Sequence, residues 1–367
     1  MACRGGPPPR PRFRLADVFR RHPPSREQFR GDEARVVRDI TSCRTPHLGG
    51  HLWRCTDCGH EARVYNSCRN RHCPTWVQKR LEDLLPVPYF HVVFTIPPQL
   101  HAWFRRSPRV AYGEIIAAAA EAMLAVCRTN LGATPGVICV LHTWTQTLLF
   151  HPHVHCIVTG GGLSLDTQAW IASPRGFLVP VRRLSPVFRA KLLERMARHV
   201  RPPRTPKQWS VYCKEPMAGP EQVLRYLGRY THRIAISDWR ILKVTARNVR
   251  FSFRNRRSNN RRDKQTLPAD RFVARYLLHV VPRRLVRIRY YGLLANAHKA
   301  TNLARARALL RSPSPPLPQA VDPWRDPIDG PAHPTPADDL RQCPGCGLRT
   351  LRLVRVLAPE PRAFQPP

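Results

Sequence analysis

Three histidines stand at every second position of one short stretch, HPHVHCIVTGGG at residues 151–162. Successive side chains of a β-strand point to opposite faces, so His151, His153 and His155 would project from one side of a sheet. Neutral imidazole is a good ligand for divalent metals, and two histidines at i and i+2 can share one ion. The pattern predicts a metal site at His153 and His155. Pro152 can bend the strand and turn His151 away, which gives that residue a structural or supporting role, and the glycines are expected to end the strand.

A third protein ligand must come from another part of the chain. Gln146 lies on the preceding predicted strand, seven residues before His153, and a hairpin would bring it alongside. A glutamine carbonyl oxygen is an acceptable ligand for a hard cation. A role at the surface or at the rim of the core is an equal alternative for this glutamine.

A second constellation is YLGRYTHR at residues 226–233. Tyr226 and Tyr230 are four residues apart, so a helix would present both phenols on one face. A phenol can attack phosphorus while guanidinium groups and a metal neutralise the charge on the non-bridging oxygens. Two tyrosines at this spacing more often have a packing role than a catalytic one. Only their combination with the histidine strand therefore indicates catalysis. Three arginines are also spaced four residues apart, and on a helix they would lie about 100° around the axis from the tyrosines. They are Arg225, Arg229 and Arg233.

Cysteine and histidine are dense between residues 43 and 73. Cys55 and Cys58 have the C-x-x-C spacing with which two thiolates reach one zinc ion. Their predicted partners are Cys73 together with Cys68 or His72, the alternative being a weakened or lost site. Structural roles are favoured over a second ion for Cys43, His47 and His51. The tail pair, Cys343 and Cys346, has no obvious partners and is not expected to bind metal.

Strands and helices that would hold these residues follow from the hydrophobic pattern. YFHVVFTIP after Pro88 reads as a buried strand, and residues 112–128 have the composition and spacing of a helix with one packed face. Two apolar strands follow, at 137–150 and 153–158. A helix followed by a hairpin-like pair of strands favours an α+β sheet domain. Further helices are expected at 185–200, 222–233 and 269–282, with a hairpin at 234–255.

Charge is the unusual part of the composition. Lys and Arg number 61 against 24 Asp and Glu, which gives a formal net charge of +37 in 367 residues. So large an excess attracts polyanions, and nucleic acid is the leading partner, although part of it can reflect a general bias toward arginine. No run approaches the roughly 20 apolar residues of a membrane helix, and the N-terminus lacks the apolar core of a signal peptide. We therefore expect a soluble, cytoplasmic, nucleoid-associated protein that does not bind membranes.

The two constellations together resemble a known family. A His-hydrophobic-His strand followed by a helix with Tyr-x-x-x-Tyr is the signature of the two-tyrosine HUH single-strand endonucleases. HPHVHCIVTGGGLS, YLGRYTHRIAIS and RIRYYGLLAN, in that order, resemble the rolling-circle transposases of insertion-sequence family ninety-one. YNSCRNRHCP at residues 65–74 is similar to the zinc-binding domain of that family, except that Trp76 stands where the family usually has cysteine. The resemblance covers about residues 35 to 300.

The resemblance implies both a chemistry and an architecture. His153 and His155 would hold Mg²⁺ or Mn²⁺, and Tyr226 or Tyr230 would attack the scissile phosphodiester to give a 5′-phosphotyrosine and a free 3′-OH. Strand transfer would need no ATP, and the sequence has no G-x-x-x-x-G-K-[ST] phosphate loop. The expected domains are a basic Pro/Arg-rich segment (1–34), a zinc-binding domain (35–88), an HUH domain with a central antiparallel sheet flanked by helices (89–300) and a flexible Pro-rich tail containing CPGC (301–367).

Three rival functions stay open at this stage. An HUH replication initiator or a relaxase would use the same chemistry. A catalytically decayed transposase would still bind DNA in a zinc-dependent way but would not cut it. This alternative stays open because Trp76 stands where the family usually has cysteine. A metal-dependent hydrolase usually needs carboxylates near its metal, and the nearest acid after the histidine strand is Asp166, beyond the glycines. The oligomeric state is also undetermined, whereas the expected partner is DNA as single-stranded element ends and target.

Overall fold

The computed structural model describes most of the chain, in two compact units. The described residues are 12–29, 32–66, 84–174, 176–217, 235–255, 258, 261–310, 343, 345–346, 348 and 350–360. Unit 1 comprises the described residues within Met1–Pro74, Ile236–Val280 and Asp326–Pro367, and unit 2 those within Thr75–Ala235 and Val281–Arg325. Both units are therefore discontinuous in sequence.

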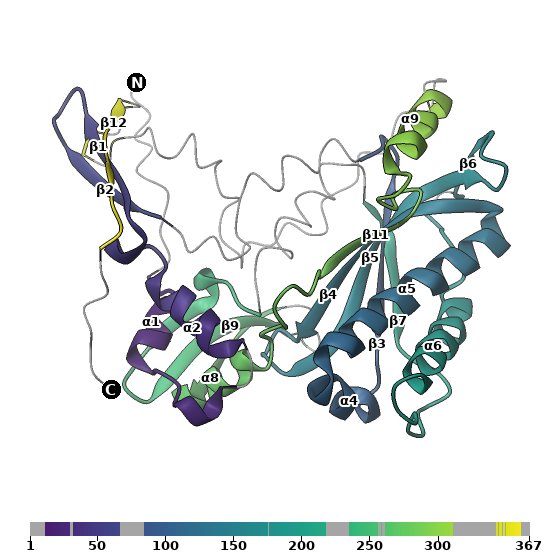
Figure 1. The fold of residues 1–367 in the computed structure, drawn as a ribbon, viewed down its shortest axis with the longest axis horizontal. Helices are drawn as coiled ribbons and strands as arrows, with labels where there is room; N and C mark the ends of the chain where they lie inside the picture. Colours follow the sequence, from purple (N-terminus) through teal and green to yellow (C-terminus); the bar gives the residue numbers. More distant parts are fainter. Residues whose placement is uncertain are drawn as a thin grey trace. The chain divides into compact units, whose positions relative to one another are not determined.

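Unit 2 is built on one antiparallel sheet with the strand order β11-β4-β5-β3-β7, and β6 pairs with the end of β5 (Figure 1). The histidine strand β5 is the central strand. This architecture confirms the predicted α+β class with a central antiparallel sheet. The elements are β3 (Tyr89–Thr95), η3 (Pro98–Leu100), α4 (His101–Arg106), α5 (Pro108–Leu131), β4 (Ala133–Trp144), β5 (Phe150–Ser164), β6 (Trp170–Ala172), α6 (Val181–Ala197), β7 (Val211–Met217), β11 (Ile288–Gly292) and α9 (Lys299–Leu310).

The long helix α5 covers one face of this sheet beside α6 (Figure 1). Pro108 occupies its first turn, where a missing N–H costs nothing, and Gly132 ends it in the left-handed conformation with φ 66°. Its length and apolar composition would suit a membrane span, but 61% of its most apolar window is buried inside the protein. Packing against the sheet and α6 therefore accounts for its apolar character.

The two faces of the sheet bury different side chains. On the face covered by helices, Phe94, Val154 and Cys156 join a large apolar core with α4, α5 and α6. On the opposite face, a second core around Tyr89, Ile157 and residues of α9 occupies one end only. The histidines lie on this second face, along the same strands.

The three glycines do not end the histidine strand, contrary to expectation. Residues 160–162 continue β5, which runs to Ser164 and pairs there with β4 and β6. A Cβ atom at Gly162 would collide with the carbonyl oxygen of Thr134, so glycine permits the close approach of β4. The glycines therefore serve strand packing beyond the histidines.

Unit 1 contains two three-stranded antiparallel sheets, ordered β12-β1-β2 and β10-β9-β8. Helices pack on the second sheet through aromatic side chains. Phe272 of α8 contacts Phe251 of the sheet, and Phe19 of α1 contacts Tyr276 of α8. The elements are α1 (Leu15–Arg21), η1 (Arg26–Gln28), α2 (Glu33–Ser42), η2 (Pro46–Leu48), β1 (Gly50–Cys55), β2 (Glu61–Tyr65), η4 (Asp238–Arg240), β8 (Ile241–Val244), β9 (Asn248–Asn255), β10 (Arg261–Pro268), α8 (Ala269–Leu277) and β12 (Leu351–Leu357).

Candidate functional site

The histidine cluster of unit 2 is formed by two paired strands. His142 on β4 pairs directly with His153 on β5, and Val140 pairs with His155, so the side chains of the three histidines share one face. Their ligand nitrogen atoms all lie within 4.8 Å of one another. His142 is buried, and His153 and His155 are half-buried. Three imidazoles this close can converge on one divalent ion with small side-chain rotations.

Hydrogen bonds orient two of these imidazole rings. The Nδ1 atom of His153 lies 2.6 Å from the backbone oxygen of His151, so Nδ1 carries the proton and Nε2 has the lone pair that a metal needs. The Nδ1 atom of His155 lies 2.7 Å from Nε2 of the buried His91 on β3. This contact engages Nδ1 of His155 and leaves Nε2 as its coordinating atom.

His151 supports the cluster through its backbone. Its ring centroid lies 5.3 Å from that of His153, and its carbonyl oxygen accepts the hydrogen bond just described. Pro152 does not break the strand, since β5 runs from Phe150 through it. Neither His142 nor His91 was predicted to belong to the site, although both stand in predicted strands.

Gln146 lies in the turn between β4 and β5, not on a strand as the sequence suggested. The turn is closed by the backbone N–H of Thr145, which donates to the carbonyl oxygen of Leu149 at 3.0 Å. The structure thus brings His142 to His153 and His155 as a candidate third ligand. The role of Gln146 as a ligand stays a prediction.

The tyrosine motif falls outside the described residues. This applies to Tyr226 and Tyr230, and equally to Arg225, Arg229 and Arg233. The described strand β7 ends at Met217, and β7 pairs with β3 beside the histidine strand. The position of the tyrosines relative to the histidines therefore remains a prediction.

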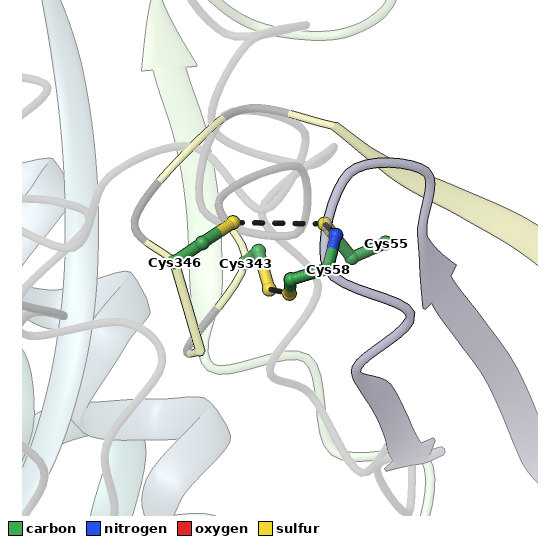
Figure 2. A group of neighbouring side chains, drawn as sticks. All are labelled: Cys55, Cys58, Cys343 and Cys346. Carbon is green, nitrogen blue, oxygen red and sulfur yellow. Dashed lines mark hydrogen bonds between the residues drawn. The ribbon is translucent and has the colours of Figure 1, made fainter.

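A four-cysteine cluster lies in unit 1, between the turn after β1 and the turn before β12 (Figure 2). Cys55 Sγ lies 3.6 Å from Cys346 Sγ, and Cys58 Sγ lies 3.5 Å from Cys343 Sγ. A tetrahedral zinc ion with Zn–S bonds of about 2.3 Å requires sulfur atoms about 3.8 Å apart. The donor set and its spacing therefore fit Zn²⁺, in a closed site of the structural kind.

The expectation that Cys343 and Cys346 have no partners was wrong, since they lie beside Cys55 and Cys58. β12 pairs with β1 from Gly50↔Leu357 to Cys55↔Leu351, and this pairing carries the CPGC turn to the CTDC turn. Backbone N–H groups also donate to sulfur in both turns, from Cys58 to Cys55 Sγ at 3.4 Å and from Gly345 to Cys343 Sγ at 3.3 Å. Cys68, His72 and Cys73, and also Trp76, lie outside the described residues.

The surroundings of Cys55 and Cys58 shift the pKa values of the two thiols in opposite directions. The hydroxyl of Thr350, 3.2 Å from Cys55 Sγ, and the backbone N–H of Cys58 lower the pKa of the Cys55 thiol to about 6. The backbone of His60 lowers the pKa of Cys58, but contacts with Cys343 and Cys55 outweigh this and raise it to about 12. Crowded sulfur atoms cannot all ionise without a cation among them, and a metal ion removes that conflict.

Two known protein families match segments of the chain that contain residues of the two sites. A family described as transposase zinc-binding domain matches residues 15–96, which contain Cys55 and Cys58. A family described as putative transposase matches residues 136–301, which contain the three clustered histidines and the two tyrosines. The pair Cys343 and Cys346 lies outside both matches.

Two curated relatives cover most of the chain. The putative transposase y4qJ of Sinorhizobium fredii is 40% identical in an alignment of 374 positions, which covers 90% of this chain and 92% of that protein. The transposase for insertion sequence element IS801 of Pseudomonas savastanoi pv. phaseolicola is 26% identical over 315 residues, which span 78% of this chain and 76% of that protein. No solved structure matches the chain significantly.

Proposed function

Because the chain belongs to the transposases of insertion-sequence family ninety-one, we propose that it cleaves and rejoins single-stranded DNA at element ends by the rolling-circle route. The observation that carries this proposal is the convergence of His142, His153 and His155 on one face of the central strand pair. A phosphodiester is an anion that resists attack, and a site of this kind collects the positive charge that the reaction needs.

The proposed metal site consists of these three imidazoles, with the side-chain oxygen of Gln146 as a further donor from the adjoining turn. A divalent ion held by these residues would supply Lewis-acid polarisation of the scissile phosphate. Imidazole suits Mn²⁺ better than Mg²⁺, which prefers oxygen ligands and retains its waters. We therefore assign Mn²⁺ as the better-matched ion for this donor set.

The proposed nucleophile is the phenol of Tyr226 or Tyr230. Its oxygen gives up its proton to solvent and forms a bond to phosphorus as the bond from phosphorus to the 3′ oxygen breaks. The leaving oxygen takes up a proton to become a 3′-OH, so no net proton is gained or lost. The DNA end stays attached to the protein as a 5′-phosphotyrosine, so a later attack by a 3′-OH rejoins strands without ATP. The guanidinium groups of Arg225, Arg229 and Arg233 would bind the phosphate oxygens of the substrate. Two tyrosines permit donor and target cleavage without release of either strand.

The zinc site has a separate, structural role. Four cysteine ligands leave no open coordination position, so the site holds the turns of unit 1 together and takes no part in strand cleavage. This role accords with the transposase zinc-binding family that matches the same segment.

One assay separates this proposal from its rivals. The full chain is incubated with Mn²⁺ and an oligonucleotide that carries candidate element ends, labelled at its 5′ or 3′ end. Cleavage with a covalent protein–DNA adduct, lost in the double variant Tyr226→Phe/Tyr230→Phe, supports the proposal. Cleavage without an adduct indicates a hydrolase, and binding without cleavage indicates a decayed DNA-binding remnant.

A further inference from the structure

The sheet β10-β9-β8 in unit 1 has one face covered by helices and one open face. Val249 and Phe251 of β9 are fully buried, and Phe251 packs on Phe272 of α8. Side chains alternate along a strand, so Arg250 between them points to the open face. Arg250 is exposed, as this alternation requires.

The strand register gathers further basic side chains around Arg250. Lys243 of β8 pairs directly with Arg250, Lys264 of β10 pairs with Ser252, and Arg262 pairs with Arg254. Lys243, Lys264 and Arg262 are exposed, as Arg250 is. These four residues, Lys243, Arg250, Arg262 and Lys264, form what we call the basic sheet face. Neighbouring strands lie about 4.8 Å apart, so their charges are close together.

Acidic side chains do not neutralise this face. Residues 236–280 contain three acids, Asp238, Asp263 and Asp270. Asp263 pairs with Phe253 and so alternates to the other side of the sheet, while Asp238 accepts a hydrogen bond from the backbone N–H of Leu15 at 2.8 Å. None of the four basic residues forms an ion pair within the part of the chain that the structure describes. Like charges held together without counter-charges repel one another, and a bound polyanion relieves that repulsion.

The chemistry of the face indicates which form of DNA it fits. Proteins that hold single strands stack bases on aromatic side chains. Phe251 and Phe253 alternate with the basic residues of β9 and lie on the opposite face, so among its described residues the open face offers charge without stacking surfaces. Exposed lysine and arginine side chains bind the phosphate groups of the DNA backbone, and these contacts do not depend on base sequence.

We propose that the basic sheet face binds the phosphate backbone of double-stranded DNA, independently of sequence and outside the histidine site. It would bind duplex DNA while unit 2 acts on a single strand. This inference goes beyond the strand cleavage proposed above, and its test measures binding alone.

The test uses the full-length protein, an arbitrary duplex without element ends and no divalent metal. The variant Lys243→Gln/Arg250→Gln/Arg262→Gln/Lys264→Gln is compared with Arg182→Gln/Arg201→Gln/Arg204→Gln/Lys207→Gln, which removes four exposed charges from unit 2. We expect the first variant to weaken duplex binding about tenfold or more and to reduce the slope of log K against log salt by about three to four. The second variant should keep most of the wild-type slope.

Two controls keep the outcome decisive. Zinc content and thermal melting establish that the exposed substitutions leave unit 1 folded. Equal losses in both variants would show that only total charge matters and would overturn the proposal. A larger loss for a single-stranded oligonucleotide than for duplex in the first variant would overturn the assignment of duplex.

Discussion

The Nε2 atom of His91 lies 2.7 Å from the Nδ1 atom of His155, and the two rings are parallel to within 1°. His91 is 2% exposed and stands on β3, next to the histidine strand. The contact fixes the orientation of His155 and directs its Nε2 atom away from β3. His91 is therefore a positioning residue in the proposed metal site.

Replacing His91 tests this role. We expect His91→Ala to weaken Mn²⁺ binding about 10- to 100-fold, as loss of a supporting hydrogen bond does at other metal sites. Raising the Mn²⁺ concentration should restore cleavage. His91→Gln, whose amide can reach the Nε2 position, should retain most of the affinity. Equal metal affinity in wild type and His91→Ala, measured by calorimetry, would contradict the role.

The third ligand can be identified by a matched set of variants. His142→Ala should abolish Mn²⁺ binding at this site, since His142 faces His153 directly across the strand pair. His151→Ala removes an adjacent imidazole but keeps the backbone oxygen that orients His153, so we expect binding near that of wild type. If Gln146→Ala abolishes binding while His142→Ala does not, the assignment of His142 is wrong.

Zinc content distinguishes the two candidate ligand sets. A structural zinc site needs all four of its thiolates. The variants Cys343→Ser, Cys346→Ser and Cys58→Ser should therefore each lower the bound zinc from about one ion per chain toward zero. Cys73→Ser should keep its zinc, and so should Cys43→Ser, a control within unit 1. Elemental analysis of the purified variants measures this directly. Zinc lost from Cys73→Ser but kept in Cys343→Ser would favour the ligands expected from sequence.

An ion-pair network predicts how the stability of unit 2 depends on pH. Arg195 of α6 contacts Glu114 of α5 at 2.6 Å and Glu121 at 2.8 Å, and His199 lies 2.9 Å from Glu114. Burial raises the pKa of Glu114, but the hydrogen bond with His199 and the charge of Arg195 outweigh this and lower it. A carboxyl group whose pKa is lowered by folding stabilises the protein above its unfolded pKa of about 4.3, and this contribution disappears as the pH falls through the folded value.

We therefore expect Glu114→Gln to lower the free energy of unfolding by about 1–3 kcal/mol at pH 7. The difference from wild type should shrink as the pH falls below about 4. Glu121→Gln, whose side chain is more exposed, should cost less than about 1 kcal/mol. Urea denaturation at several pH values checks both. A difference that stays constant down to acidic pH would exclude an ionic contribution.

Much of the fold of unit 2 could be predicted from local patterns. The strand after Pro88 corresponds to β3 and the helix over 112–128 lies within α5, whereas the helix expected over 185–200 corresponds to α6, which begins earlier and ends at Ala197. Their apolar spacing and their proline and glycine boundaries are local signals, so sequence reveals them. The α+β class followed from the order of these elements.

The partners of the two metal sites were harder to predict because they depend on pairing between distant segments. His142 is one more histidine in an apolar strand until the register of β4 against β5 is known. Cys343 lies 285 residues from Cys58, and nothing local joins them. One signal was available, since CTDCG and CPGCG share the C-x-x-C-G pattern and thus form two similar half-sites.

Covalent attachment of DNA to a tyrosine of residues 226–233 is the step on which the proposed function depends. After reaction with an oligonucleotide and Mn²⁺, the protein is digested with trypsin and the nucleotide-bearing peptide is identified by mass spectrometry. Cleavage after Arg229 separates YLGR from YTHR, so the measurement also shows which tyrosine carries the DNA. We predict a 5′-phosphate linked to one of these two peptides. Attachment to YYGLLANAHK, which contains Tyr290 and Tyr291, or strand cleavage without any attached nucleotide, would contradict the proposed function.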